Sequence, residues 1–141
     1  MTVKEYLNQV RVLDLKINQK IEEKEMLMHL ATGTGSQDIK SDRVQTSIDL
    51  HKTEAVIAKY VDLETEITRM IDQYVDLRDK IINEIHQLTD IRYVDVLHQR
   101  YVLGHSFELI AVNMNYSIRR VYQLHGDALQ EFAHSVSFNC M

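Results

Sequence analysis

The chain has no proline, no tryptophan and only four glycines among its 141 residues. Proline breaks helices and glycine weakens them, so a chain with so little of either is expected to be mainly helical. Its one cysteine, Cys140, excludes an intrachain disulfide and favours a reducing compartment. No apolar stretch approaches the length of a membrane span, and the start lacks the apolar run of a signal peptide. We therefore expect an all-α cytoplasmic protein that does not enter a membrane.

Positive charge is also scarce. There are 16 Lys and Arg against 21 Asp and Glu, which gives a formal net charge of −5 and argues against a protein that coats nucleic acid without specificity. The seven histidines are scattered, and none lies in the His-Glu-x-x-His pattern of a zinc helix. The lone cysteine has no base near it in sequence. We expect no catalytic residues, no metal site and no cofactor.

Residues 2–31 are predicted to form the first helix, because Val3, Tyr6 and Val10 begin a series of apolar residues at steps of three and four. Thr2 and Glu5 are placed to form a capping box at its start. Residues 32–46 contain two glycines and many short polar side chains, which predicts a flexible linker. A phosphate-binding loop would end in Gly-Lys-Ser/Thr, and that ending is missing.

The next stretch, residues 47–88, has neither glycine nor proline, and its apolar residues recur at alternating steps of four and three. This spacing is typical of a coiled-coil seam. We expect the first helix to fold back antiparallel and cover part of the seam, while a second copy of the chain covers the rest in a homodimer. A bundle within one chain that buries the whole seam is the alternative. The predicted seam consists of Val56, Tyr60, Leu63, Ile67, Met70, Tyr74, Leu77 and Ile81.

The remaining faces of this long helix are acidic, with nine Asp or Glu against five Lys or Arg in residues 47–88. Asp72, Asp76 and Asp79 follow one another at helical spacing. Such a strip is often only a solvated face. It would also suit a protein partner with a basic surface, which makes these residues a candidate partner face.

Residues 89–134 are predicted to form a second domain after the 1–88 hairpin. A helix capped by Thr89 or Asp90 and running to about Val102 comes first, and a helix-turn-helix follows it. In the helix-turn-helix, Ser106 and Ser117 are placed to cap the two helices. Asn115 falls at the turn, where the backbone usually needs a positive φ that Asn tolerates. The expected contact between the two helices involves Ala111, Val121, Leu124 and Ala128.

Several residues of this segment match a known pattern. They are Arg100–Tyr101, Ser106, Ile110–Ala111, Met114–Asn115–Tyr116–Ser117, Val121, Leu124–His125–Gly126 and Ala128–Leu129–Gln130–Glu131–Phe132. Through them, residues 93–132 resemble region 4 of sigma-70 factors, in the form carried by small phage-encoded proteins similar to the late-transcription regulators of Gram-positive phages. The first helix, which contains KEYLNQVRVLDLKINQKIEE, also resembles the opening helix of that family. The resemblance implies DNA binding by the second helix of the motif and a role in transcription control.

Two functions therefore remain open. In the first, the protein is a phage transcription regulator that binds duplex DNA in the cytoplasm of a host bacterium. Arg119, Tyr122 and Gln123 would face the major groove, and Ser117 and Arg120 would hold phosphates, together with Arg100 or His105.

In the second, the protein is an interaction module or inhibitor that binds a host polymerase, nuclease or repressor through its acidic coiled coil. Residues 89–141 carry four arginines, no lysine and five acidic residues, which is little positive charge for holding phosphates. Asp127 also stands where the family usually has a basic residue. Both observations favour this second function.

Overall fold

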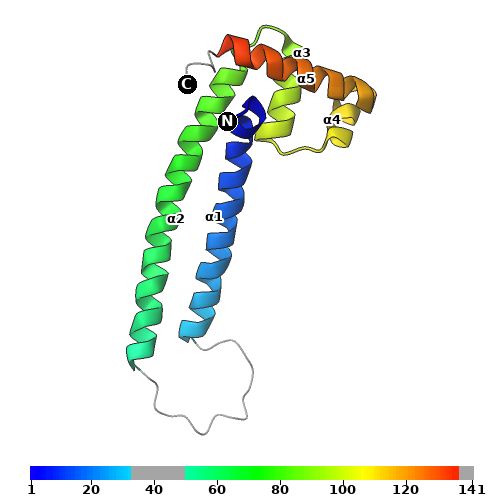
Figure 1. The fold of residues 1–141 in the computed structure, drawn as a ribbon. Helices are drawn as coiled ribbons and strands as arrows, with labels where there is room; N and C mark the ends of the chain where they lie inside the picture. The colour runs from blue at the N-terminus through cyan, green and yellow to red at the C-terminus, as the bar shows by residue number, and fades with distance from the viewer. Residues whose placement is uncertain (33–49, 137–141) are drawn as a thin grey trace. The chain divides into compact units, whose positions relative to one another are not determined.

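The computed structural model describes residues 1–32 and 50–136, and all secondary structure in these two ranges is helical (Figure 1). The predicted all-α class is therefore confirmed. Most of the predicted linker, from residue 33 on, lies outside the described residues, as does Cys140. The elements are α1 (Val3–Thr32), α2 (Leu50–Ile85), α3 (Ile91–Leu97), the π-helix η2 (His98–Val102), α4 (Phe107–Met114) and α5 (Ile118–Ser135).

The starts of α1 and α3 follow from local hydrogen bonds. In the predicted capping box, the backbone N–H of Glu5 donates to Thr2 Oγ1 at 3.1 Å, and the N–H of Thr2 donates to Glu5 Oε2 at 2.8 Å. At the start of α3, Asp90 is the N-cap and accepts from the backbone N–H of Arg92 at 2.9 Å. These side chains satisfy backbone donors that a helix leaves without an internal partner.

The chain divides into two compact units. Unit 1 comprises Met1–Asp14 and Gln73–Met141, and unit 2 comprises Leu15–Asp72. The ends of both long helices thus share a unit with the shorter helices, whereas the sequence predicted a boundary between residues 88 and 89. The predicted boundary between residues 88 and 89 stays a prediction.

Unit 2 consists of a segment of α1 and a segment of α2 that lie side by side (Figure 1). Two ion pairs join them: Lys20 Nζ lies 3.5 Å from Glu66 Oε1, and Lys24 Nζ lies 3.9 Å from Glu64 Oε1. Their side chains are partly exposed, so each pair contributes at most about 1 kcal/mol. Burial of apolar surface therefore supplies most of the stabilisation. The buried apolar residues of unit 2 are Ile17, Leu63, Ile67 and Met70.

The core of unit 1 draws on every helix in it. The α2 helix ends at Ile85, before the predicted end of this stretch at residue 88, and Leu88 is buried in this core. A tilted aromatic pair, Tyr6 of α1 and Phe132 of α5, has ring centroids 6.1 Å apart. The buried residues of this core are Leu7, Val10, Ile81, Ile85, Leu88, Val96, Leu97, Tyr101, Ile110, Ala111, Val121, Ala128 and Phe132.

All eight residues of the predicted seam are buried or half-buried within the single chain. Leu63, Ile67, Met70 and Ile81 are 0–7% exposed, and the other four are intermediate. The chain's own side chains thus cover the seam that was expected to remain partly open for a second copy. The apolar residues of α2 that remain exposed lie beside the seam, at Ile57, Val61, Ile71 and Val75.

The predicted helix, capped by Asp90 and ending at about Val102, is confirmed, but its second half, from His98 to Val102, is a π-helix. A π-turn inserts an extra residue and is often found at functional sites. Here it brings both Gln99 and Tyr101 inside the protein, with exposed fractions of 7% and 2%. Both side chains form hydrogen bonds there.

Candidate nucleic-acid interface

The local features predicted for the segment around α4 and α5 are confirmed. Ser106 Oγ accepts from the backbone N–H of Leu109 at 3.2 Å, and Ser117 Oγ accepts from that of Arg120 at 3.1 Å. Between the helices, Asn115 has φ 62° and ψ 40°, in the left-handed region. Two capped helices thus meet at a turn that only glycine or a residue such as asparagine adopts readily.

The inward faces of the two helices are apolar and closely packed. Ala111 is 9% exposed, while Ile110, Val121 and Ala128 are fully buried. At such a contact a larger side chain than alanine would have to displace its neighbours. This packing fixes which side of α5 points outward.

The outward side of α5 carries the five predicted DNA-contacting residues. Ser117, Arg119, Tyr122 and Gln123 are exposed, and Arg120 is half-buried. The guanidinium of Arg119 has no hydrogen-bond or ion-pair partner within the described ranges. That of Arg120 lies 3.5 Å from Gln123 Oε1. The structure brings all five residues together on the first two turns of α5 and the residue before them.

Arg92 adds little positive charge to this face. Its Nη2 lies 2.8 Å from Asp90 Oδ2, and its backbone N–H and Nε also donate to that carboxylate. Hydrogen bonds from Arg92 lower the pKa of Asp90, and the positive charge of Arg120 lowers it further. The pair is therefore charged and mutually neutralised, which leaves Arg119 and Arg120 as the main cationic groups of the face.

Arg100 and His105, the two further residues predicted to hold phosphates, are half-buried and form contacts within the protein. The guanidinium carbon of Arg100 lies 4.2 Å from the ring centroid of Phe107, and its Nη1 donates to the backbone oxygen of His105 at 3.1 Å. His105 Nδ1 shares a hydrogen bond of 3.2 Å with Gln99 Oε1. Both side chains position the loop before α4.

A polar network that the sequence did not predict joins the π-helix to its neighbours. Gln99 Nε2 donates to Asp95 Oδ1 at 2.8 Å, and Gln99 Oε1 accepts from Asn113 Nδ2 at 2.9 Å. Because Gln99 is almost fully buried, each of these bonds replaces one to water, and losing a partner would leave a buried polar group unpaired. The network holds α4 against η2.

A second unpredicted contact joins η2 to α5. Tyr101 Oη and His125 Nε2 share a hydrogen bond of 2.7 Å, and both side chains are buried. Burial lowers the pKa of His125 to about 4, with the positive charges of Lys4 and Arg100 lowering it further. Burial raises the pKa of Tyr101 to about 12. Both groups are therefore neutral at pH 7, which suits an apolar core.

Phe107 connects this buried pair to the exposed face. Its ring stands edge-on to His125, with centroids 5.0 Å apart, and lies 4.9 Å from the ring of Tyr122. The only sequence feature that could have indicated His125 is its place four residues after Val121, on the inward face of α5. Its partner could not be read from local spacing, since 24 residues separate Tyr101 from His125.

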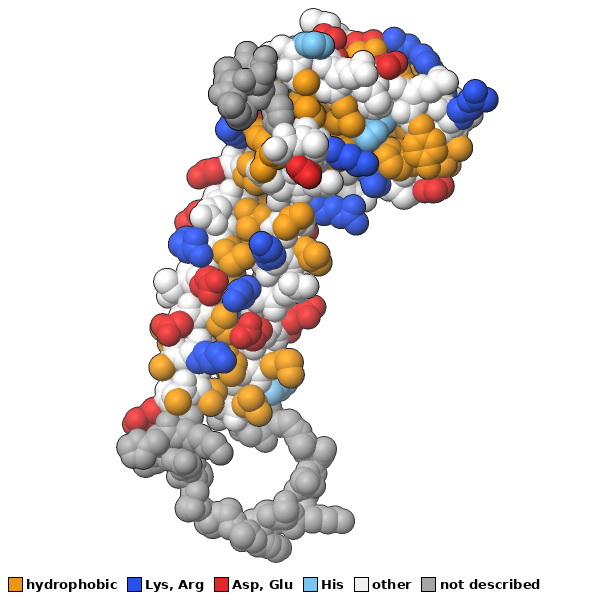
Figure 2. All heavy atoms as spheres, viewed as in Figure 1, with side chains coloured by type: hydrophobic (Ala, Val, Ile, Leu, Met, Phe, Trp, Pro, Cys, Tyr) orange, Lys and Arg blue, Asp and Glu red, His pale blue; other side chains and the backbone are white. Residues whose placement is uncertain are grey.

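The candidate partner face lies on α2. Asp72, Asp76 and Asp79 are all exposed, and none forms an ion pair with a residue that the structure describes. Space-filling representation shows acidic and basic side chains interspersed along the long helices (Figure 2). The three carboxylates are thus accessible, on a surface of mixed charge.

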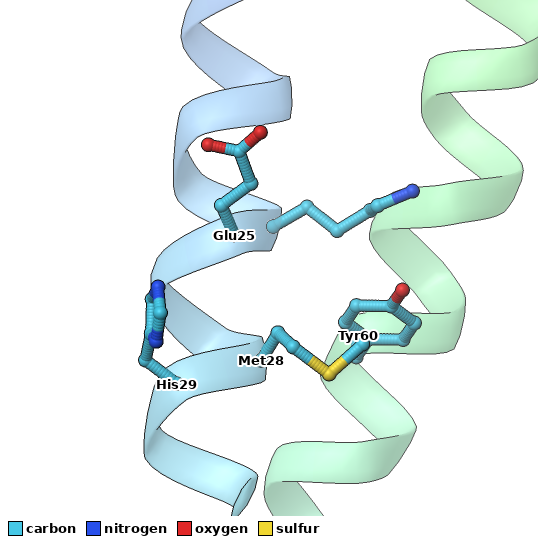
Figure 3. Close-up of a pocket in the computed structure, with 5 residues that line it drawn as sticks. Glu25, Met28, His29 and Tyr60 are labelled. Carbon is cyan, nitrogen blue, oxygen red and sulfur yellow. The ribbon is translucent and has the colours of Figure 1, made fainter. Parts of the chain in front are cut away.

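Unit 2 also has a small hollow of about 140 Å³ between its two helical segments (Figure 3). The side chain of Met28 extends from α1 toward Tyr60, and Lys24 Nζ lies 5.4 Å from the Tyr60 ring centroid. Glu25 and His29 complete the lining. The surface of the hollow is mostly apolar.

Within residues 1–32 and 50–136, no three His, Cys, Asp or Glu side chains gather in a way that could hold a metal ion. His86 and His98 approach each other, with ring centroids 6.3 Å apart, but two imidazoles alone make an incomplete ligand set. None of the described helices is long and apolar enough to cross a membrane.

Comparison of the chain with models of known protein families, with curated proteins and with solved structures finds no match.

Proposed function

We propose that this protein is a phage-encoded transcription regulator that binds duplex DNA, in the cytoplasm of a bacterial host, through a helix-turn-helix formed by α4 and α5. The observation that carries the proposal is the row of outward residues on α5, in which Arg119 has no partner among the residues that the structure describes. The row consists of Ser117, Arg119, Arg120, Tyr122 and Gln123. Two serine caps and the left-handed Asn115 support it, because they fix the turn before that row. The resemblance to region 4 of sigma-70 factors points to the same helix.

In this proposal the row divides into two kinds of contact. Arg119, Tyr122 and Gln123 enter the major groove and touch base edges, since they lie on the exposed side of the helix. Ser117 and Arg120 contact phosphates. The Ser117 hydroxyl accepts from a backbone N–H and still has its own proton to donate to a phosphate oxygen.

Arg119 is proposed to contact a base and Arg120 a phosphate, and these two kinds of contact predict different losses of binding. Replacing Arg119 with alanine should cost about 1–3 kcal/mol on the preferred sequence and little on random duplexes, as expected for a bidentate contact to guanine. Replacing Arg120 should weaken binding to all sequences alike and reduce the salt dependence by about one unit. Gel-shift titrations over a range of salt measure both.

Arg69→Ala is the matched control, because Arg69 is exposed on α2 and has no place in the proposed interface. If Arg119→Ala lost the same binding free energy on preferred and random duplexes, Arg119 would not be a base-recognition residue.

We further propose that the regulator acts as a homodimer, with α1 and α2 serving assembly as an antiparallel hairpin. One α5 has few cations, so two copies would have to act together to bind tightly at physiological salt. The seam is already covered within one chain, and the second copy would instead contact the apolar residues beside it in unit 2. Ile57, Val61 and Ile71 are 49%, 50% and 41% exposed.

Ile57→Glu combined with Val61→Glu is therefore expected to convert the dimer into a folded monomer. The two new charges would be buried without partners at the interface but solvated in the monomer. Sedimentation at micromolar concentration gives the mass, and circular dichroism checks that the helices remain. Lys59→Glu with Gln73→Glu is the control, since both positions are exposed on the side of α2 away from Ile57 and Val61. A wild-type monomer would contradict the proposal.

The second candidate function is a module that binds a basic host protein through the exposed carboxylates of Asp72, Asp76 and Asp79. Their accessibility and lack of ion pairs within the described ranges favour it. Changing all three to asparagine should then abolish capture of the partner and leave duplex binding unchanged. Capture from host lysate with and without nuclease treatment separates this function from DNA binding.

A further inference from the structure

The exposed row on α5 contains apolar surface as well as polar groups. Ile118 is 37% exposed and Tyr122 is 50% exposed, one turn apart and on the same flank of the helix. Figure 2 shows hydrophobic side chains gathered at the α4 end of unit 1, next to basic ones. Single exposed apolar residues need no explanation. Two of them in register beside Arg119 form a defined apolar edge to the proposed interface.

This edge is held in place by the protein. The Tyr122 ring packs against Phe107 at an interplanar angle of 57°, and Phe107 in turn packs on buried His125. Ile118 is the first residue of α5, directly after the Ser117 cap, and its branched side chain has few rotamers. Neither side chain would therefore lose much conformational freedom on binding a ligand.

We propose that Ile118 and Tyr122 contact the 5-methyl groups of thymines in the major groove, so that the protein prefers duplexes with thymine beside the base pair read by Arg119. The inference rests on the proposed function. The thymine methyl is the one apolar group that the four base pairs present in the major groove. An apolar edge next to an arginine and a glutamine is complementary to it.

The spacing along α5 agrees with this assignment. Four residues separate Ile118 from Tyr122, which is a rise of about 6 Å along the helix. Successive bases on one strand are about 3.4 Å apart, so the two side chains span about two base steps. Arg119 lies between them in sequence and is exposed. A guanine between or next to two thymines is the arrangement that this row fits.

Replacing thymine with uracil tests the proposal, because the exchange removes the methyl group and leaves every hydrogen-bonding group in place. Duplexes would first be selected from a random library on the full-length protein. Each thymine of the selected site would then be replaced in turn, and binding measured by fluorescence anisotropy. We expect one or two positions at which uracil weakens binding about fourfold, which corresponds to about 0.8 kcal/mol for one buried methyl group.

Ile118→Ala should abolish this discrimination at one of the positions, and Tyr122→Ala at the other. Ile91→Ala is the matched control, since Ile91 is 74% exposed on α3 and should leave the uracil effect unchanged. Thermal melts of each variant would confirm that the fold is retained.

Three results would overturn the proposal, and each contradicts a different part of it. If the wild type binds selected duplexes but uracil is equivalent to thymine at every position, the methyl contact is wrong and DNA binding stands. If both variants retain the full discrimination, the assignment to Ile118 and Tyr122 is wrong. If the wild type selects and binds no duplex, the proposed function fails, and the methyl contact fails with it.

Discussion

Replacing Phe132 with alanine is expected to lower the free energy of unfolding by about 3–5 kcal/mol. Phe132 is completely buried in the core of unit 1, where its ring lies against Tyr6. Deleting the ring would remove its transfer free energy and leave a cavity among side chains from several helices. The free energy of unfolding of a small domain is only about 5–15 kcal/mol in total, so the variant would lose a large part of its stability.

Denaturant unfolding followed by circular dichroism measures this loss. Tyr122→Ala is a suitable control, because the same kind of truncation at a half-exposed ring should cost far less. A loss below about 1 kcal/mol for Phe132→Ala would mean that α5 is not anchored in the core at this residue.

Acidification from pH 6.5 to about 4 is expected to destabilise the protein by up to about 3 kcal/mol through His125 alone. Its pKa in the folded protein is about 4, below the ordinary value of 6.5, because the ring is buried and the positive charges of Lys4 and Arg100 disfavour its protonation. The unfolded chain therefore binds a proton in this pH window that the folded protein does not. The stabilisation is fully present above about pH 6.5 and is lost as the pH falls toward 4.

His125→Gln separates this effect from other titrations. Glutamine can still hydrogen-bond Tyr101 but does not titrate, so the variant should be less stable at pH 7 and less sensitive to acid. Burial also lowers the pKa of His98, but His98 is present in both the wild type and the His125→Gln variant and contributes the same acid sensitivity to each. The difference between the two pH profiles of unfolding free energy thus reports His125. Parallel profiles would show that His125 is not neutral in the folded state.

Features that depend on neighbouring residues could be predicted from the sequence. The caps at Ser106 and Ser117, the capping box at Thr2 and the positive φ of Asn115 each involve side chains within a few residues of the backbone they affect. The absence of proline and the scarcity of glycine were enough for the all-α class. For the proposed interface, helical periodicity predicted five outward residues on α5, of which Arg120 is half-buried and the other four are exposed.

Features that depend on distant residues could not be predicted. The π-helix exists where Gln99 and Tyr101 both find partners inside, and those partners come from α3, α4 and α5. The position of the Arg100 guanidinium over the Phe107 ring could not be predicted from neighbouring residues. The heptad spacing of α2 indicated a buried seam, but spacing alone does not state whether the covering surface belongs to the same chain.

Binding of duplex DNA at low salt tests the central proposal most directly. Variants of Asp127 add a predicted order of affinities to this test. Asp127 is exposed on α5, where its charge would repel phosphates. We predict that the wild type binds duplexes at about 50 mM salt and loses affinity as salt increases. Asp127→Arg should bind more tightly, with Asp127→Asn intermediate between them. If neither the wild type nor Asp127→Arg binds any phage or random duplex at that salt concentration, the protein is not a DNA-binding regulator.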